Sequence, residues 1–403
     1  MNKIIIAALV ATLAMPTLAK DDKKAKNNPD TLIFTTVLEN PVTPIKNQKN
    51  SGTCWSYSSL AFLESEVIRI HPEMKDEIDL CESFLVSKTY TDRADRNVRT
   101  HGDASFTEGG SFYDAIYCMK NYGLIPEGIM PYPKTLYGDS LFNFSGFFQP
   151  MQAYVEAISK SDAKKINPHW KDAVQCMLDC YFGKCPTEFE YKGVTYTPKT
   201  FVKDYLGLNP DDYVSLTSYT HHPFYTQFIL EIQDNWRWAS SYNLPLDEFM
   251  RVMEESVRAG WTFAWGADVS EDGFARREGK NKCVATVPLK DEDDDAGYDQ
   301  SRWTGEKVKI SESDNEGEKI ITQDMRQEAY DNWETTDDHG MQIYGIAKDQ
   351  HGKEYFMMKN SWGDYGPYEG FWYVSKPYVA YKTMNIVINK NAIPADIRAK
   401  LNI

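Results

Sequence analysis

The chain has 403 residues, of which 42% are hydrophobic and 26% charged, and this composition is that of a globular protein, not a disordered one. The length allows one large two-lobed domain with an insertion, or two domains. The formal net charge of −15 at pH 7 repels phosphate backbones and anionic lipid, so neither nucleic acid nor a membrane is an expected partner.

The first residues carry the three parts of a secretory signal peptide over 1–19. Lys3 supplies a positive start, 4–14 is apolar, and Thr17-Leu18-Ala19 is a small-x-small cleavage site. The apolar run is shorter than the roughly 20 residues that span a membrane. We expect export to the periplasm or out of the cell after cleavage. A buried or swapped N-terminal helix is the alternative.

A charged leader and a strand over 32–38 lead to a polar loop, and this loop ends at Cys54. From 55 to 70 apolar residues recur at threes and fours, so the sequence predicts a helix that starts at the cysteine. A thiol on the first turn of a helix lies near unpaired N–H groups and the positive end of the helix dipole, and both favour a thiolate. The Gln48 amide is close enough in sequence to join the Cys54 backbone N–H in holding an oxyanion. A cysteine beside a tryptophan is more often a small core residue, so this motif alone is weak.

A second predicted helix spans 112–121, and Gly109-Gly110 precedes it. Two adjacent glycines have two interpretations. They allow an extended peptide to approach the backbone closely, or they form an ordinary turn.

The segment 135–255 reads as an insertion, with helices expected over 149–159 and 246–257. Cys176 and Cys180 would share one helix face, and Cys185 follows them. In an exported protein Cys185 could be bonded to one of them. Reduced, buried thiols are the favoured alternative, and a zinc site lacks the usual spacing.

Two further segments could suggest metal binding. His221-His222 point in different directions and have no third ligand at a useful spacing, so a polar loop is expected. The acidic run 291–295 lacks the alternating ligands and the glycine of a calcium loop, and it reads as a solvated loop. We therefore expect no metal and no cofactor.

The remainder reads as a strand-rich lobe with a short helix over 325–333. Strands are expected over 261–269, 341–347, 355–359, 371–375 and 384–389. His339 begins one of these strands and Asn360 ends the next, so the two side chains can meet if the strands pair as a hairpin. A cysteine nucleophile, a histidine base and an asparagine that orients the imidazole are a complete set of catalytic roles. The two lobes would place Cys54 and His339 on opposite walls of a cleft.

The order Gln48, Cys54-Trp55, His339 and Asn360-Ser361-Trp362-Gly363 resembles that of papain-like cysteine peptidases. The details are most similar to the bleomycin hydrolase/aminopeptidase C family. Further motifs that carry the resemblance are Thr43-Pro44-Ile45-Lys46-Asn47, Glu108-Gly109-Gly110, Tyr122-Gly123-Leu124-Ile125-Pro126 and Phe263-Ala264-Trp265-Gly266-Ala267. The resemblance covers most of 41–390 and is weak between 135 and 240.

The resemblance implies an α+β, papain-like two-lobed fold, with a helical N-terminal lobe, an antiparallel sheet in the C-terminal lobe and a large, mostly helical insertion. The expected divisions are a signal peptide (1–19), leader and first strand (20–40), helical catalytic lobe (41–134), helical insertion (135–255), sheet-rich catalytic lobe (256–390) and C-terminal arm (391–403).

The resemblance also implies a cysteine aminopeptidase that acts on peptides and forms homohexamers. Gly109 and Gly110 would then line the substrate groove, and Trp362 would shield the His339–Asn360 hydrogen bond. The family's C-terminal arm lies in the cleft, which makes Ile403 the expected anchor for the substrate amine, although this tail lacks the usual family ending. An exported endopeptidase with an open cleft is one alternative. A non-catalytic peptide-binding protein on the same fold is the other.

Overall fold

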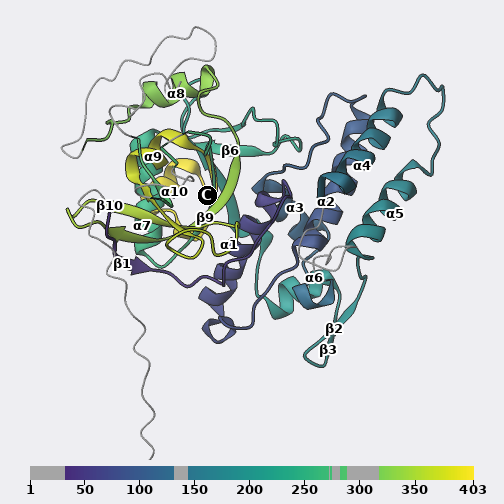
Figure 1. The fold of residues 1–403 in the computed structure, drawn as a ribbon, viewed down its shortest axis with the longest axis horizontal. Coiled ribbons are helices and arrows are strands. Elements are labelled where there is room, and N and C mark those ends of the chain that lie inside the picture. The colour runs from purple at the N-terminus through teal and green to yellow at the C-terminus, as the bar shows by residue number, and fades with distance from the viewer. Residues whose placement is uncertain (1–31, 131–143, 272, 275–281, 288–316) are drawn as a thin grey trace, which may run out of the picture. The chain divides into compact units, whose positions relative to one another are not determined.

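The structure, a computed structural model, describes residues 32–130, 144–271, 273–274, 282–287 and 317–403. The predicted signal peptide and the acidic run 291–295 lie outside these ranges. The residues from Leu32 to Ile403 form one unit, which has a helical part and a part built on a large sheet (Figure 1).

The helical part is formed between residues 54 and 200. Its helices are α1 Cys54–Ile70, α2 Glu82–Arg99, α3 Phe112–Asn121, α4 Phe144–Ser159, α5 Trp170–Phe182 and the short α6 Pro198–Thr200. Aromatic rings of α2, α4 and α5 pack against one another in its core, among them Tyr90, Phe144 and Phe182. Among the described residues, no helix combines the length and the apolar character that crossing a membrane requires.

Ten strands form one sheet in the order β5-β6-β4-β12-β7-β9-β10-β11-β8, and β1 pairs with β9 outside this path. The strands are β1 Thr35–Glu39, β4 Tyr213–Thr217, β5 Gln227–Ile229, β6 Ser240–Asn243, β7 Phe263–Ala267, β8 Val284–Ala285, β9 His339–Lys348, β10 Glu354–Lys359, β11 Phe371–Ser375 and β12 Thr383–Asn389. Pairing is antiparallel except between β4 and β6 and between β11 and β8. A separate hairpin joins β2 Phe189–Tyr191 and β3 Val194–Tyr196.

Four helices belong to the sheet part: α7 Leu246–Arg258, α8 Gln323–Asp331, α9 Lys376–Lys382 and α10 Ala395–Leu401. Short single turns complete the described chain: η1 Pro72–Met74, η2 Glu127–Ile129, η3 Phe201–Tyr205, η4 Pro210–Asp212 and η5 Lys390–Ala392.

Strand β9 is buried on both faces because helices cover each of them. Gly340 and Gln342 face α1. A Cβ on Gly340 would lie 2.7 Å from Ser58 Oγ, and Gln342 Nε2 donates to Ser65 Oγ at 2.7 Å. Met341 and Ile343 point the other way, into a core that α7 shares. Helix α1 and strand β9 are therefore fixed against each other, and this contact sets the positions of Cys54 and His339.

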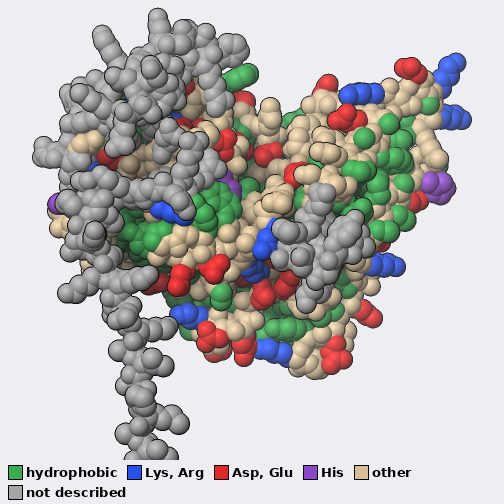
Figure 2. Space-filling view, viewed as in Figure 1, with side chains coloured by type: hydrophobic (Ala, Val, Ile, Leu, Met, Phe, Trp, Pro, Cys, Tyr) green, Lys and Arg blue, Asp and Glu red, His purple; other side chains and the backbone are tan. Residues whose placement is uncertain are grey.

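Acidic and basic side chains are interspersed over the visible face of the described residues (Figure 2). Some charges join elements that are distant in sequence. Glu354 at the start of β10 pairs with Arg258 of α7 at 2.6 Å and with Lys376 of α9 at 2.8 Å. This cluster ties two helices to the sheet.

The predicted insertion contains short strands as well as the expected helices. Helices α4 and α5 account for its first part and α7 for its end, but between them it supplies β4, β5 and β6, which extend the large sheet beyond β12. These strands have five residues or fewer. Because such short strands show little alternation of apolar and polar residues, the sequence pattern did not reveal them.

Candidate active site

Cys54 and His339 line one small cavity between the start of α1 and the start of β9. The side chains around them come from segments far apart in the sequence: Trp55, Gly110, Ser111, Phe112, Ile232, Asp234, Gly266, Asp337, Asp338, Gly340 and Asn385.

Buried ionic contacts behind Cys54 hold helix α1 in place. Glu64 of α1 accepts hydrogen bonds from Thr43 Oγ1 at 2.5 Å and from the Leu80 backbone N–H at 2.8 Å. Lys46 bridges Glu64 at 3.4 Å and Glu82 at 2.7 Å. The loop before Cys54 and the start of α2 are thereby attached to the same face of α1, which fixes the helix that begins at Cys54.

Cys54 is the first residue of α1 and is half-buried. The pKa of its thiol is raised to about 12. Burial is the main cause, and the charges of Asp234 and Asp337 add to it, whereas hydrogen bonds to the backbone at Gly340 and Trp55 oppose it. The helix N-terminus alone predicted a stabilised thiolate. In this cavity burial and two acids outweigh the effect of the helix N-terminus, so a thiolate needs a positively charged neighbour.

His339 and Asn360 meet as the predicted hairpin required. Strands β9 and β10 pair antiparallel with Gln342 opposite Lys359, and His339 Nε2 lies 2.8 Å from Asn360 Oδ1. The same oxygen accepts from the Ser361 backbone N–H at 2.8 Å, which identifies it as the carbonyl oxygen of the amide. The hydrogen of the imidazole is thus on Nε2, and Nδ1 is its basic nitrogen when the ring is neutral.

Trp362 covers this hydrogen bond. Its ring stacks on His339, with 4.8 Å between ring centroids and 29° between planes. The bond is therefore shielded from water on that side, as expected from the sequence motif.

Gln48 connects the loop before Cys54 with the segment after Asn360. Its Oε1 accepts from Ser361 Oγ at 2.6 Å, and its backbone N–H donates to the Ser361 carbonyl at 2.8 Å. Its Nε2 donates to the Ser51 carbonyl at 2.7 Å, which uses one of its two hydrogens. The orientation of the amide is therefore fixed at both ends.

The two glycines of the predicted groove have different surroundings. Gly110 lines the cavity, and a Cβ there would lie 2.7 Å from the Trp55 ring. A Cβ on Gly109 would overlap the carboxylate of Asp234, which lies directly against this glycine. Gly110 therefore fits the groove prediction, whereas Gly109 is covered by a side chain from the insertion.

Asp234 and Asp337 are cavity residues that sequence reasoning missed. Asp234 lies between β5 and β6, where no local pattern marks it, and Arg93 binds its carboxylate at 3.3 Å. Asp337 stands two residues before His339, so the acidic pair Asp337-Asp338 beside the histidine was the available signal.

The tail packs on the core of the sheet part, and the role of Ile403 as anchor for the substrate amine stays a prediction. Ile397 and Leu401 of α10 are buried in the core of the sheet part, and Ile403 packs against the same core. Asn402 ends the helix in a left-handed conformation at φ 57°. The spacing of Ile397 and Leu401 gives α10 one apolar face, and burial of this face holds the tail on the sheet.

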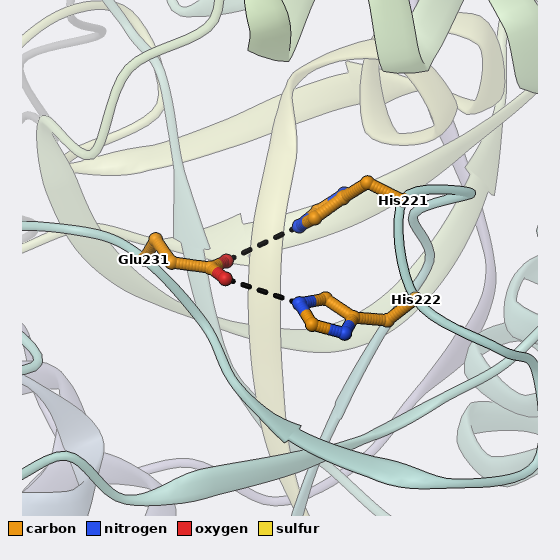
Figure 3. A group of neighbouring side chains, drawn as sticks. All are labelled: His221, His222 and Glu231. Atoms are coloured by element: carbon orange, nitrogen blue, oxygen red, sulfur yellow. Dashed lines mark hydrogen bonds and ion pairs between the residues drawn. The ribbon is translucent and has the colours of Figure 1, made fainter.

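His221 and His222 have a third neighbour, contrary to the expectation from sequence. Figure 3 shows the carboxylate of Glu231 facing both rings, with each Nε2 at 3.1 Å from one carboxylate oxygen. Gln327 Nε2 lies 3.1 Å from His221 Nδ1, so that nitrogen accepts and Nε2 carries the hydrogen that Glu231 receives. This tautomer suits a hydrogen-bonded cluster, because a metal would need Nε2 without its hydrogen.

All seven cysteines lie in the described residues as thiols. Cys176 and Cys180 are exposed on α5, and Cys185 lies 3.5 Å from Ser87 Oγ. This agrees with the favoured prediction of reduced thiols, although these three are not fully buried.

Family models match both parts of the chain. The model described as Papain family cysteine protease matches residues 34–197, and that of the Peptidase C1-like family matches 185–403. Together with the two-part fold, these matches define a papain-like cysteine peptidase and confirm the predicted α+β fold. The chain belongs to the Peptidase C1-like family.

Relatives match over most of their length. Aminopeptidase G of Lactobacillus delbrueckii subsp. lactis is 23% identical over 401 residues, which are 91% of this chain and 85% of the relative. Aminopeptidase C of Streptococcus thermophilus is 24% identical over 394 residues, 87% of this chain and 81% of the relative. The crystal structure of pepw from Lactobacillus rhamnosis HN001 has a TM-score of 0.63 and 19% identity, covers 91% of this chain and 84% of its own, and supports the fold.

Proposed function

We propose that the chain is a cysteine aminopeptidase, which removes N-terminal residues from peptides by means of Cys54, His339 and Asn360. The observation that carries the proposal is the His339–Asn360 hydrogen bond under Trp362, beside a cavity that also holds Cys54 at a helix start. The names of the relatives, aminopeptidase G and aminopeptidase C, support the step from peptidase to aminopeptidase.

In the first half of the reaction, Cys54 gives its proton to His339 Nδ1, because Nε2 is engaged by Asn360. The sulfur then forms a bond to the carbonyl carbon of the first peptide bond. The oxyanion accepts hydrogen bonds from the Cys54 backbone N–H and the Gln48 amide. His339 donates its proton to the leaving nitrogen as the C–N bond breaks, and a thioester remains.

In the second half, His339 removes a proton from water, and the hydroxide attacks the thioester. The C–S bond breaks, the amino acid leaves, and Cys54 regains its thiol. Because burial raises the pKa of Cys54, the imidazolium must remain next to the sulfur as its counter-charge. Asn360 and Trp362 assist by holding that ring in one orientation.

The test uses residues 20–403, expressed under reducing conditions, and fluorogenic aminoacyl amides with a free or an N-acetylated amine. We expect cleavage of the free-amine substrate only, and a loss of at least about 10³-fold in kcat in Cys54→Ala. Cys176→Ala, which removes an exposed thiol, is the matched control and should retain activity.

Two results would change the assignment. Equal or faster cleavage of the acetylated substrate would identify an endopeptidase. A folded protein without thiol-dependent cleavage of either substrate would identify a peptide-binding protein.

A further inference from the structure

We propose that Asp234 and Asp337 bind the α-ammonium group of the substrate and so restrict this enzyme to peptide N-termini. The proposal rests on the proposed aminopeptidase function. It assigns the role of amine anchor to two internal carboxylates that line the cavity.

Both carboxylates lie where an amine anchor is needed, in the cavity that contains Cys54 and His339. They reach it from different segments. Asp337 belongs to the segment that leads into β9, and Asp234 belongs to the loop between β5 and β6. The amine of an N-terminal residue is separated from its own carbonyl carbon by one carbon atom, so its anchor must share the nucleophile's cavity.

The loop that carries Asp234 is fixed by buried contacts. Trp236 Nε1 and Arg237 Nε both donate to Asp114 of α3, at 3.1 and 2.5 Å. Arg93, which is fully buried, binds Asp234 and also donates to the Gly109 carbonyl. Asp234 is thus held in place next to Gly109, and Arg93 binds its carboxylate.

Asp337 differs from Asp234, Asp338 and Asp268 because no side chain or backbone group of the described residues binds its carboxylate. In the described part of the chain, its carboxylate takes part in no hydrogen bond or ion pair. Asp338 accepts from Thr336 Oγ1 at 2.8 Å, and Asp268 accepts from the Thr336 backbone N–H at 2.9 Å. The cavity therefore contains an acid whose natural complement is a cation from outside the protein.

A substrate ammonium supplies this cation. It carries a positive charge and three N–H donors, which two carboxylates can share. An N-acetylated amine has one N–H, no charge and an extra acetyl group. Because Asp234 occupies the space over Gly109, a chain that extended further in that direction would meet its carboxylate. Charge and shape thus both favour a free N-terminus.

The two acids also link substrate recognition to the nucleophile. Burial raises the pKa of Asp337, and its acidic neighbours Asp234, Asp338 and Asp268 raise it further. Asp234 and Asp337 in turn raise the pKa of Cys54. An ammonium bound between them would offset this repulsion, so a substrate with a free amine would favour the thiolate that attacks it.

The experiment compares Asp337→Asn and Asp234→Asn with the matched control Asp162→Asn, an exposed acid between α4 and α5. For free-amine substrates we expect kcat/KM to fall about 10- to 100-fold in either cavity variant and to stay unchanged in the control. The preference for free over acetylated amines should fall by a similar factor.

A second readout does not depend on peptidase activity. Asp337 raises the pKa of Cys54, so its replacement should lower that pKa and make alkylation by iodoacetamide at pH 7 roughly tenfold faster in Asp337→Asn. Asp234→Asn could unfold the protein by depriving buried Arg93 of its partner, whereas Asp337→Asn removes no such contact. Circular dichroism of both variants separates the two cases.

The outcomes separate the two proposals. A wild-type protein without aminopeptidase activity would contradict the proposed function, whatever the variants do. An active wild type with unchanged amine preference and unchanged alkylation in Asp337→Asn would overturn the anchor. Faster alkylation together with a lost preference would support it.

Discussion

Both the oxygen and the nitrogen of the Gln48 side-chain amide are hydrogen-bonded, to Ser361 and to Ser51. One N–H of Nε2 remains available after the hydrogen bond to Ser51. The role that we propose for it is to donate to the oxyanion. This role requires the amide to be oriented before the substrate arrives, because a donor that must reorganise stabilises the transition state less. Ser361 provides that orientation.

Replacing Gln48 should therefore affect the chemical step more than binding. We expect Gln48→Ala to lower kcat about 10²- to 10³-fold with little change in KM. Ser361→Ala keeps the donor and removes only the hydroxyl on Oε1, so a loss of about tenfold or less is expected. Steady-state kinetics on an aminoacyl amide measure both. An unchanged kcat in Gln48→Ala would exclude the oxyanion role.

Cys54, His339 and Asn360 could be predicted from sequence because each stands at or next to the start or end of an element. Trp362 could be predicted because it belongs to the motif Asn360-Ser361-Trp362-Gly363. Asp234 could not be predicted, since its place depends on contacts of its loop with α2 and α3. The state of the Cys54 thiol could not be predicted either. The helix start was visible in the sequence, but the burial and the two neighbouring acids arise only in the folded chain.

At the scale of elements, Glu354 connects β10 with α7 and α9 through Arg258 and Lys376. Burial raises the pKa of Glu354, but hydrogen bonds and the charges of Lys376 and Arg258 outweigh it and lower the pKa to about 2. Because this value is below that of an unfolded glutamate, the contribution to stability is present above about pH 4.5 and is lost as the pH falls through about 2.

We expect Glu354→Gln to lower the free energy of unfolding at pH 7 by about 1–2 kcal/mol, after allowance for solvent screening. The difference from wild type should shrink as the pH falls from 4.5 towards 2. Urea unfolding at pH 7, 4 and 2.5 measures it. Glu190→Gln, an exposed acid on β2, is the control. A difference that does not vary with pH would contradict the charge-based explanation.

Helices and strands in which apolar residues recur at a regular spacing could be predicted from the sequence. The helix over 112–121 is confirmed as α3, and the strand over 371–375 is confirmed as β11. The strands β4 to β6 were missed. They lie in the insertion, where the strands are short and their burial depends on β12, so tertiary contacts decide their structure.

At the scale of the whole molecule, the two-part α+β arrangement followed from the order of helical and strand-like segments along the chain. The position of the tail did not follow, because α10 owes its place to its contacts with the sheet part. Export and assembly into a homohexamer stay predictions. Sedimentation of the mature protein would measure its assembly state.

Removing 395–403 should destabilise the protein without changing its specificity. Ile397 and Leu401 are 0% and 4% exposed, so their loss should cost about 3–6 kcal/mol in unfolding free energy. Lys400→Ala, which removes an exposed ion pair with Glu248 and a cation–π contact with Tyr225, should cost much less than the deletion.

A shorter deletion separates folding from specificity. Removing only Asn402-Ile403 leaves α10 in place, and the preference for free over acetylated amines should remain that of the full chain. Conversion into an endopeptidase by this deletion would show instead that the C-terminus takes part in substrate recognition.

The position of the tail also has a practical consequence. Since α10 ends at Asn402 on the core of the sheet part, Ile403 is a suitable attachment point for an affinity tag or a surface linker. The enzyme could then be immobilised through its last residue while peptides still enter the cavity at Cys54.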